Sequence, residues 1–167
     1  MTDYLEKQLD RVNSWLSFAE AKNAALIAFD VAMLAVCADW YDKCPVPVII
    51  IAILFVISGG LCLLSFSPKL VSNPESLNTG ANTSTLNLIY FADIAKFNDE
   101  NDYIEQVRLK YYPSLSQQDA RKNIHIDFAI EILINSRIAV SKYGIFKKAL
   151  YVDVFAFALI VILLIIA

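Results

Sequence analysis

The stretch VIIIAILFVISGGLCLLSF, residues 48–66, decides the fold, because it runs for nineteen positions without a charged side chain. A helix needs about 20 apolar residues to cross the hydrocarbon core of a bilayer. Glycines inside such a helix let a neighbouring helix approach closely. We therefore predict a transmembrane helix here, with Gly59 and Gly60 at a seam between helices.

The composition of the whole chain also indicates a membrane protein. Its 167 residues are 57% hydrophobic and 19% charged, which is too apolar for an ordinary soluble domain of this length. The formal net charge is only −3 and acids alternate with bases, so we expect no nucleic-acid partner. The three cysteines and His125 lack metal-ligand spacing, and no catalytic motif is recognisable. We therefore expect neither an enzyme nor a metal or cofactor site.

An amphipathic helix is predicted over residues 2–22, with Thr2 available as its N-cap. Alternating spacings of four and three residues put the apolar side chains on one helical face, at Leu5, Leu9, Val12, Leu16 and Ala19. Over residues 24–38 the only charged side chain is Asp30. Because this run is short for a span, the helix is expected to begin below the membrane and to enter it near Lys22, whose stem can snorkel. Together with residues 48–66 it makes a transmembrane hairpin.

Three charged residues of this first helix are candidates for function. A carboxylate at mid-membrane costs about 2.5 to 3.5 kcal/mol on insertion scales, so Asp30 should not face lipid. It is either a polar or pore-lining group at a helix seam or a protonated acid hydrogen-bonded inside the bundle. Glu20 and Lys22 lie at the membrane entrance and, being two positions apart, do not face each other on a helix. They are either plain interfacial charges or ligand contacts.

The rest of the chain is predicted to be helical after a linker over residues 71–87, which is rich in Ser, Thr, Asn and Gly. Residues 88–112 favour one or two helices with a polar break at 98–101, and Ser116 with Asp119 starts another helix. Residues 117–167 contain no proline and could form one helix of about 75 Å. Its last fourteen residues, 154–167, are apolar, so they form a short third span or a tail dipping into the bilayer.

These elements define an all-α membrane protein with four parts. The parts are an N-terminal amphipathic cytosolic helix (1–23), a transmembrane hairpin (24–67), a cytosolic helical region (68–148) and a C-terminal membrane segment (149–167). Three Lys or Arg precede the first span and ten lie between Lys69 and Lys148, whereas the hairpin loop has only Lys43. The positive-inside rule then puts the N-terminus and the central region in the cytoplasm.

A set of aromatic and basic residues could bind a small nucleotide, because aromatic rings stack on bases and cations meet phosphates. The set comprises Tyr90, Phe91, Arg137, Lys142 and Tyr143. The same residue types also occur as core aromatics and solvated cations, and the pattern alone leaves both interpretations open.

Four blocks in this order resemble the transmembrane effector family of Pycsar, a bacterial antiphage system. They are RVNSWLSFAEAKNAALIAF at 11–29, LLSFSPKL at 63–70, LIYFADIAKF at 88–97 followed by NDYIEQV, and INSRIAVSKYGIFKKAL at 134–150. The resemblance implies a partner nucleotide cyclase that makes cyclic CMP (cCMP) or cyclic UMP (cUMP) on infection. It also implies an effector, expected to be a homo-oligomer, that then disrupts the inner membrane and causes abortive infection.

Other functions remain compatible with the same layout. A structural or scaffold subunit could use its long helix to dock a cytosolic partner, without any small molecule. Two-span effectors of other nucleotide-signalled defence systems share the arrangement, so the layout by itself does not identify the messenger. A transporter fits poorly, because two or three spans with one buried acid leave little for a substrate path.

Overall fold

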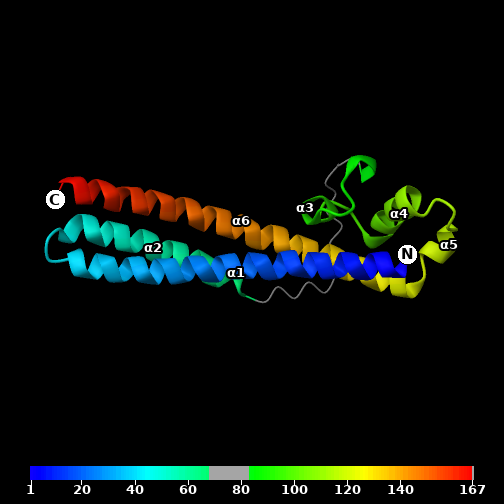
Figure 1. Cartoon of the computed structure of the whole chain (residues 1–167), viewed down its shortest axis with the longest axis horizontal. Helices are drawn as coiled ribbons and strands as arrows, with labels where there is room; N and C mark the ends of the chain where they lie inside the picture. Colours follow the sequence, from blue (N-terminus) through cyan, green and yellow to red (C-terminus); the bar gives the residue numbers. More distant parts are fainter. Residues whose placement is uncertain (68–82, 167) are drawn as a thin grey trace. The chain divides into compact units, whose positions relative to one another are not determined.

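The computed structural model describes residues 1–67 and 83–166 of the chain, and these residues form helices and no strand (Figure 1). In chain order the elements are α1 (Thr2–Trp40), α2 (Pro45–Ser65), the short 3₁₀ helix η1 (Thr83–Thr85), α3 (Phe91–Ile94), α4 (Glu100–Tyr111), α5 (Gln117–Ala120) and α6 (Asn123–Ile166). The predicted linker over 71–87 lies outside the described residues up to position 82. The all-helical fold predicted from the sequence is confirmed.

The chain divides into two compact units. The first comprises residues 1–17 and 69–141, and the second comprises 18–68 and 142–167. Helices α1 and α6 each continue from one unit into the other. The predicted division into cytosolic and membrane parts refers to a bilayer, and it stays a prediction.

In the first unit, α3 and α4 and the segment before them pack on the N-terminal part of α1. The fully buried side chains include Leu88, Ile94, Phe97, Tyr103 and Val107. The helix α1 contributes its predicted apolar face, since Leu5 and Val12 are fully buried. Two of its polar side chains hold the segment before α3: the Tyr4 hydroxyl donates to the Leu88 carbonyl at 3.1 Å, and Gln8 Nε2 donates to the Ile89 carbonyl at 2.8 Å.

Side chains cap the N-termini of α4 and α5, and the start of α5 at Ser116 is the one that the sequence predicted. The polar break separates α3 from α4, and α4 begins with Asp99 as N-cap, whose carboxylate accepts from the Asp102 amide at 2.8 Å. The Ser116 hydroxyl likewise accepts from the Asp119 amide at 3.1 Å and starts α5. Each cap satisfies an amide that the helix itself leaves without a partner.

Two details at His125 differ from the sequence prediction. The expected single helix from 117 is broken, because α5 ends at Ala120 and α6 begins at Asn123. The buried His125 ring lies with Nδ1 3.0 Å from the Ala120 carbonyl, which a continuous helix would use for its own ladder. Thr2 is not an N-cap, since it lies inside α1 and its hydroxyl is 2.9 Å from His125 Nε2. Helix α6 therefore has 44 residues, about 66 Å instead of 75 Å.

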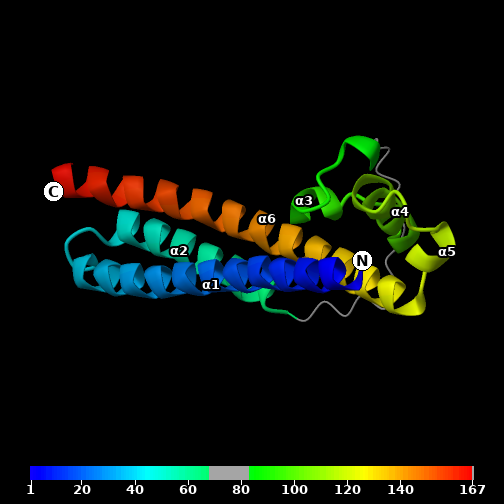
Figure 2. The same cartoon turned by 45° about the vertical axis from the view of Figure 1, so that its right-hand side comes forward.

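The second unit is a bundle of three helices, in which the C-terminal part of α1, helix α2 and the C-terminal part of α6 lie side by side (Figures 1 and 2). A core cluster joins all three, and it consists of Cys37, Val48, Ile51, Phe55, Ala156 and Ile160. A smaller cluster also joins the three helices elsewhere along the bundle, and it consists of Leu26, Cys62 and Ala149. Apolar contact therefore runs along most of the bundle.

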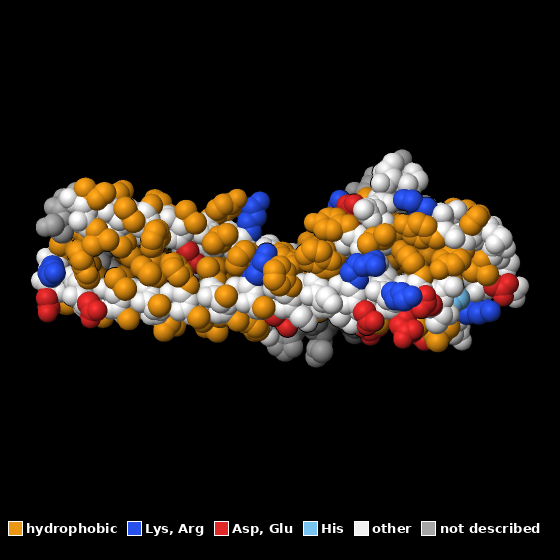
Figure 3. All heavy atoms as spheres, viewed as in Figure 1, with side chains coloured by type: hydrophobic (Ala, Val, Ile, Leu, Met, Phe, Trp, Pro, Cys, Tyr) orange, Lys and Arg blue, Asp and Glu red, His pale blue; other side chains and the backbone are white. Residues whose placement is uncertain are grey.

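The outer surface of this bundle is also apolar. Figure 3 shows hydrophobic side chains over most of the visible face of these three helices. Val31, Leu64, Val154 and Ile165 are all at least 60% exposed. Helices α1, α2 and α6 are each long and apolar enough to cross a membrane. An apolar exterior of this extent fits lipid and not water, so the third segment, which the sequence left as a span or a dipping tail, belongs to a helix of spanning length.

Candidate functional site

Two buried carboxyls face each other in the apolar bundle. Asp30 of α1 and Asp153 of α6 are each 2% exposed, and the hydroxyl of Ser58 on α2 lies near both. Among the described residues, no oxygen of either carboxyl completes a hydrogen bond. The prediction that Asp30 does not face lipid fits this arrangement. Its further role at a seam remains a prediction.

The close approach of α2 to α1 at this level depends on Gly59. A Cβ added at Gly59 would lie 3.2 Å from Asp30 Oδ2, which is tighter than an ordinary contact. At Gly60 an added Cβ would meet no described atom within 4 Å. Of the two predicted seam glycines, the structure therefore puts Gly59 against the carboxyl, whereas Gly60 has no close neighbour in the described chain.

Lys142 joins the three helices of the bundle at the predicted membrane entrance. Its ammonium forms an ion pair with Glu20 of α1 at 2.9 Å and donates to the carbonyl of Ser65, the last residue of α2, at 2.8 Å. A lysine at the carboxyl end of a helix satisfies an orphan carbonyl and complements the helix dipole. The Lys142 side chain is 10% exposed and that of Glu20 is 45% exposed, so the cation is buried and its partner is not.

Lys22, the other entrance residue, is surrounded by aromatic rings. Its ammonium lies 4.7 Å from the ring centre of Phe18, 5.3 Å from Tyr143 and 5.5 Å from Phe146. Such contacts are attractive, because the quadrupole of an aromatic ring gives its face a partial negative charge. Glu20 and Lys22 therefore use different partners, as their two-residue spacing predicts.

Arg137, a predicted ligand residue of the first unit, binds backbone carbonyls of the protein itself. Its guanidinium donates to the carbonyls of Ala95 at 3.4 Å, Phe97 at 2.7 Å and Asn98 at 3.2 Å. These carbonyls follow α3, so the arginine fixes the turn between α3 and α4.

The predicted aromatic ligand residues of the first unit differ in exposure. Tyr90 is 47% exposed and Phe91 is 5% exposed, with their ring centres 5.0 Å apart. Trp15 of α1 packs on the Phe91 ring at 5.4 Å. Tyr90 therefore offers an open aromatic face, whereas Phe91 belongs to the core.

The five predicted ligand residues divide between the units. Tyr90, Phe91 and Arg137 lie in the first, and Lys142 and Tyr143 lie in the second. Both cations already bind protein oxygens in this structure. A phosphate would have to replace those oxygens, so the ligand role of these residues stays a prediction.

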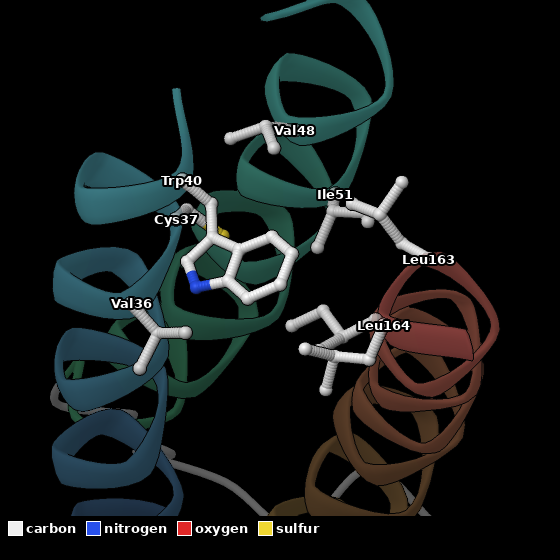
Figure 4. A pocket seen from close by; sticks show the side chains of 8 residues that line it. Val36, Cys37, Trp40, Val48, Ile51, Leu163 and Leu164 are labelled. Carbon is white, nitrogen blue, oxygen red and sulfur yellow. The ribbon is translucent and has the colours of Figure 1, made fainter. Parts of the chain in front are cut away.

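The hollows of the bundle are apolar. One cavity of about 40 Å³ lies between α1, α2 and α6, where the Trp40 ring extends from α1 toward Leu163 and Leu164 (Figure 4). A void of this size with apolar walls stays dry and does not fit a nucleotide. A larger groove of about 340 Å³ is lined by α1 and α6, and its only acidic lining residue is Asp153. In the described residues, no three His, Cys, Asp or Glu side chains gather in a way that could hold a metal ion.

Sequence reasoning missed two residues of this region, Asp153 and Ser58. Asp153 is a lone acid directly before the apolar run over 154–167, so the argument applied to Asp30 could also have found it. A serine among apolar residues carries little information by itself. Trp15 and the Ser65 carbonyl were also missed.

Comparison with known proteins gives one result. A family model described as the Pycsar effector protein domain matches residues 4–167, which is nearly the whole chain. No curated protein and no solved structure matches it.

Proposed function

Because the chain belongs to the Pycsar effector family, whose members act in antiphage defence with a partner cyclase, we propose that it binds cCMP or cUMP and then disrupts the bacterial inner membrane. Loss of the membrane barrier would end the infected cell before phage mature. The observation that carries the proposal is the family match over residues 4–167 on a chain with three helices able to cross a membrane.

The distribution of charge supports a sensor on the cytoplasmic side. Between positions 69 and 148 the chain has ten Lys or Arg residues, against one in the α1–α2 loop. By the positive-inside rule, the N-terminus and the central region then face the cytoplasm, where a cyclase releases its product. Helices α1 and α6 continue from the first unit into the membrane bundle, so a change in the sensor can reach the spans through them.

For ligand contacts we propose Tyr90 and Arg137, two of the residues predicted from the sequence, which both lie in the first unit. The half-exposed Tyr90 ring is suited to stack on a base. Arg137 now donates to three neutral carbonyls. A phosphate oxygen is a stronger acceptor than a carbonyl, because charge-assisted hydrogen bonds are about twice as strong as neutral ones. Ligand binding would then free the turn that follows α3.

A ligand opens the membrane path only if it binds the open arrangement better than the closed one. Moving the population from about 1% to about 99% open requires roughly 5.5 kcal/mol of preference. Several sites in a homo-oligomer would share this requirement, which is the reason for expecting more than one copy in the active form.

The proposal is tested with full-length protein reconstituted in KCl-loaded liposomes that are diluted into NaCl, with K⁺ release followed by an ion-selective electrode. We expect cCMP or cUMP to release K⁺, and the purine cyclic nucleotides to release none. Empty liposomes with the same nucleotides are the control. Absence of nucleotide-dependent release, with insertion confirmed by protease protection, would instead favour a scaffold that docks a cytosolic partner.

The ligand contacts are tested separately by binding. Tyr90→Ala should weaken nucleotide affinity by about 1 to 3 kcal/mol, the range for stacking of one base on an aromatic side chain, and Tyr90→Phe should retain the affinity. Tyr111→Ala is a matched control in the same unit, since Tyr111 is 38% exposed and packs on Tyr4. Equal affinity of Tyr90→Ala and the wild type would remove Tyr90 from the site.

A further inference from the structure

The bundle contains an acidic centre that its apolar surroundings do not explain. Asp30, Asp153 and Ser58 come from the three different helices, and each of the three residues is at most 2% exposed. Two carboxylates are both acceptors, so they cannot hydrogen-bond each other without a proton or a cation between them. No oxygen of either carboxyl has a hydrogen-bond partner among the described residues, and the Ser58 hydroxyl donates instead to the Ala149 carbonyl at 3.4 Å.

The apolar parts of the three helices carry negative but no positive side chains. Residues 23–38, 45–65 and 149–166 contain Asp30 and Asp153 and no lysine or arginine. An acid in mid-membrane costs about 2.5 to 3.5 kcal/mol on insertion scales, and two acids double the cost. Plain packing would be served better by an apolar residue at either position. Intramembrane acids are kept for function, and ion pathways and proton relays are among their roles.

Packing around the pair is tight on one side and loose on the other. On the α2 side, Gly59 brings the backbone against Asp30 Oδ2. Between α1 and α6, by contrast, the groove of about 340 Å³ is lined by apolar side chains and Asp153. Separation of α1 from α6 would therefore bring the two carboxyls into contact with water before it disturbed the α1–α2 contact.

We propose that Asp30 and Asp153 are the ion-selecting residues of the membrane leak, and that they make it a path for monovalent cations. The inference rests on the proposed function, since it needs an opened bundle. Once water reaches the pair, the carboxyl groups ionise. The resulting carboxylates attract cations and repel anions, as rings of acidic side chains do in cation channels. The leak is then a selective path through the protein and not a general rupture of the bilayer.

The test is the reversal potential of the nucleotide-triggered current in a planar bilayer, measured under a KCl gradient with the full-length protein. We expect the wild type to reverse near the K⁺ equilibrium potential. The double variant Asp30→Asn/Asp153→Asn should keep its current but reverse near zero, because the amides are of similar size and carry no charge. Asp153→Glu keeps the charge and should keep the cation preference.

The matched control is Asp10→Asn, which removes an exposed acid from the first unit and should leave the reversal potential unchanged. A wild-type current that reverses near zero, or a double variant that still reverses at the wild-type potential, would overturn the inference while leaving the proposed function intact. Absence of any nucleotide-dependent current would instead overturn the proposed function, and the inference with it. If the double variant does not insert, the single variant Asp153→Asn decides: its reversal potential should lie between the wild-type value and zero, and an unshifted value would overturn the inference.

Discussion

Replacing Lys142 by methionine should open the bundle in the absence of nucleotide. Lys142 of α6 holds α1 through Glu20 and α2 through the Ser65 carbonyl. Methionine keeps an unbranched apolar stem and removes the charge. Hydrogen bonds to a charged group contribute about 1.5 to 3 kcal/mol when they are shielded from water, and the Lys142 side chain is 10% exposed. We take about 2 kcal/mol for the loss.

That loss is large relative to the free energy that favours the closed state over the open one. If about 1% of molecules are open at rest, the closed state is favoured by roughly 2.7 kcal/mol, and removing about 2 kcal/mol raises the open fraction to about a quarter. Glu20→Gln should have a smaller effect, since Glu20 is 45% exposed and exposed ion pairs contribute about 0.2 to 1 kcal/mol. The variant Lys142→Met/Glu20→Gln should leak no more than Lys142→Met alone, because Lys142→Met already removes the ion pair with Glu20.

The assay is basal K⁺ release from KCl-loaded liposomes without nucleotide. Lys148→Met is the matched control, because Lys148 is an exposed lysine on the same helix. Circular dichroism of each variant shows whether the helices are retained. If Lys142→Met releases K⁺ no faster than Lys148→Met, the idea that this contact favours the closed bundle is wrong.

Three further predictions concern stability, measured by thermal unfolding of the purified protein in detergent. Gly59→Ala should destabilise by about 1 to 3 kcal/mol through overpacking, since its Cβ would meet Asp30 Oδ2 at 3.2 Å, whereas Gly60→Ala should have no such cost; equal effects would contradict the seam geometry. His125→Ala should cost about 1 to 3 kcal/mol, because it leaves the Thr2 hydroxyl and the Ala120 carbonyl without their contact; an unchanged midpoint would argue against it. The hydrogen bond from Arg108 lowers the pKa of Glu105 below its usual value, so this pair stabilises fully above the ordinary glutamate range and loses its effect as pH falls through the lowered pKa. The variant Glu105→Gln should lack the part of the stability loss at low pH that comes from protonation of Glu105. Identical curves of unfolding temperature against pH for this variant and the wild type would contradict the prediction.

The elements that the sequence predicted are those with local signals. The span over 48–66 follows from a run of apolar residues, and the start of α5 follows from Ser116, whose side chain reaches an amide three positions along. The cost of a carboxylate in a bilayer likewise predicts, from the apolar run around Asp30, that this residue does not face lipid. Each of these predictions uses one continuous stretch of sequence, so no knowledge of the tertiary fold is needed.

The contacts that close the bundle have no such signal. Glu20 and Lys142 pair across more than a hundred residues, and Ser65 takes part through its backbone carbonyl, which every residue type has. Arg137 was predicted as a phosphate contact from its residue type, but its present partners are carbonyls of residues 95–98. Residue type indicates what a side chain can bind, and packing decides which acceptor it reaches.

Asp153 is the instructive case, because the reasoning applied to Asp30 holds equally for it. Once residues 149–166 are accepted as a span, an acid within them needs a partner that is not lipid. The three spans offer no lysine or arginine over 23–38, 45–65 or 149–166. Within one copy, the remaining polar partners at that depth are a hydroxyl or the other acid, and two acids together need a proton or a cation. In a closed, dry bundle a proton can meet this need, whereas in an opened bundle, where water lets both acids ionise, a cation meets it. This is the requirement that a cation path would use.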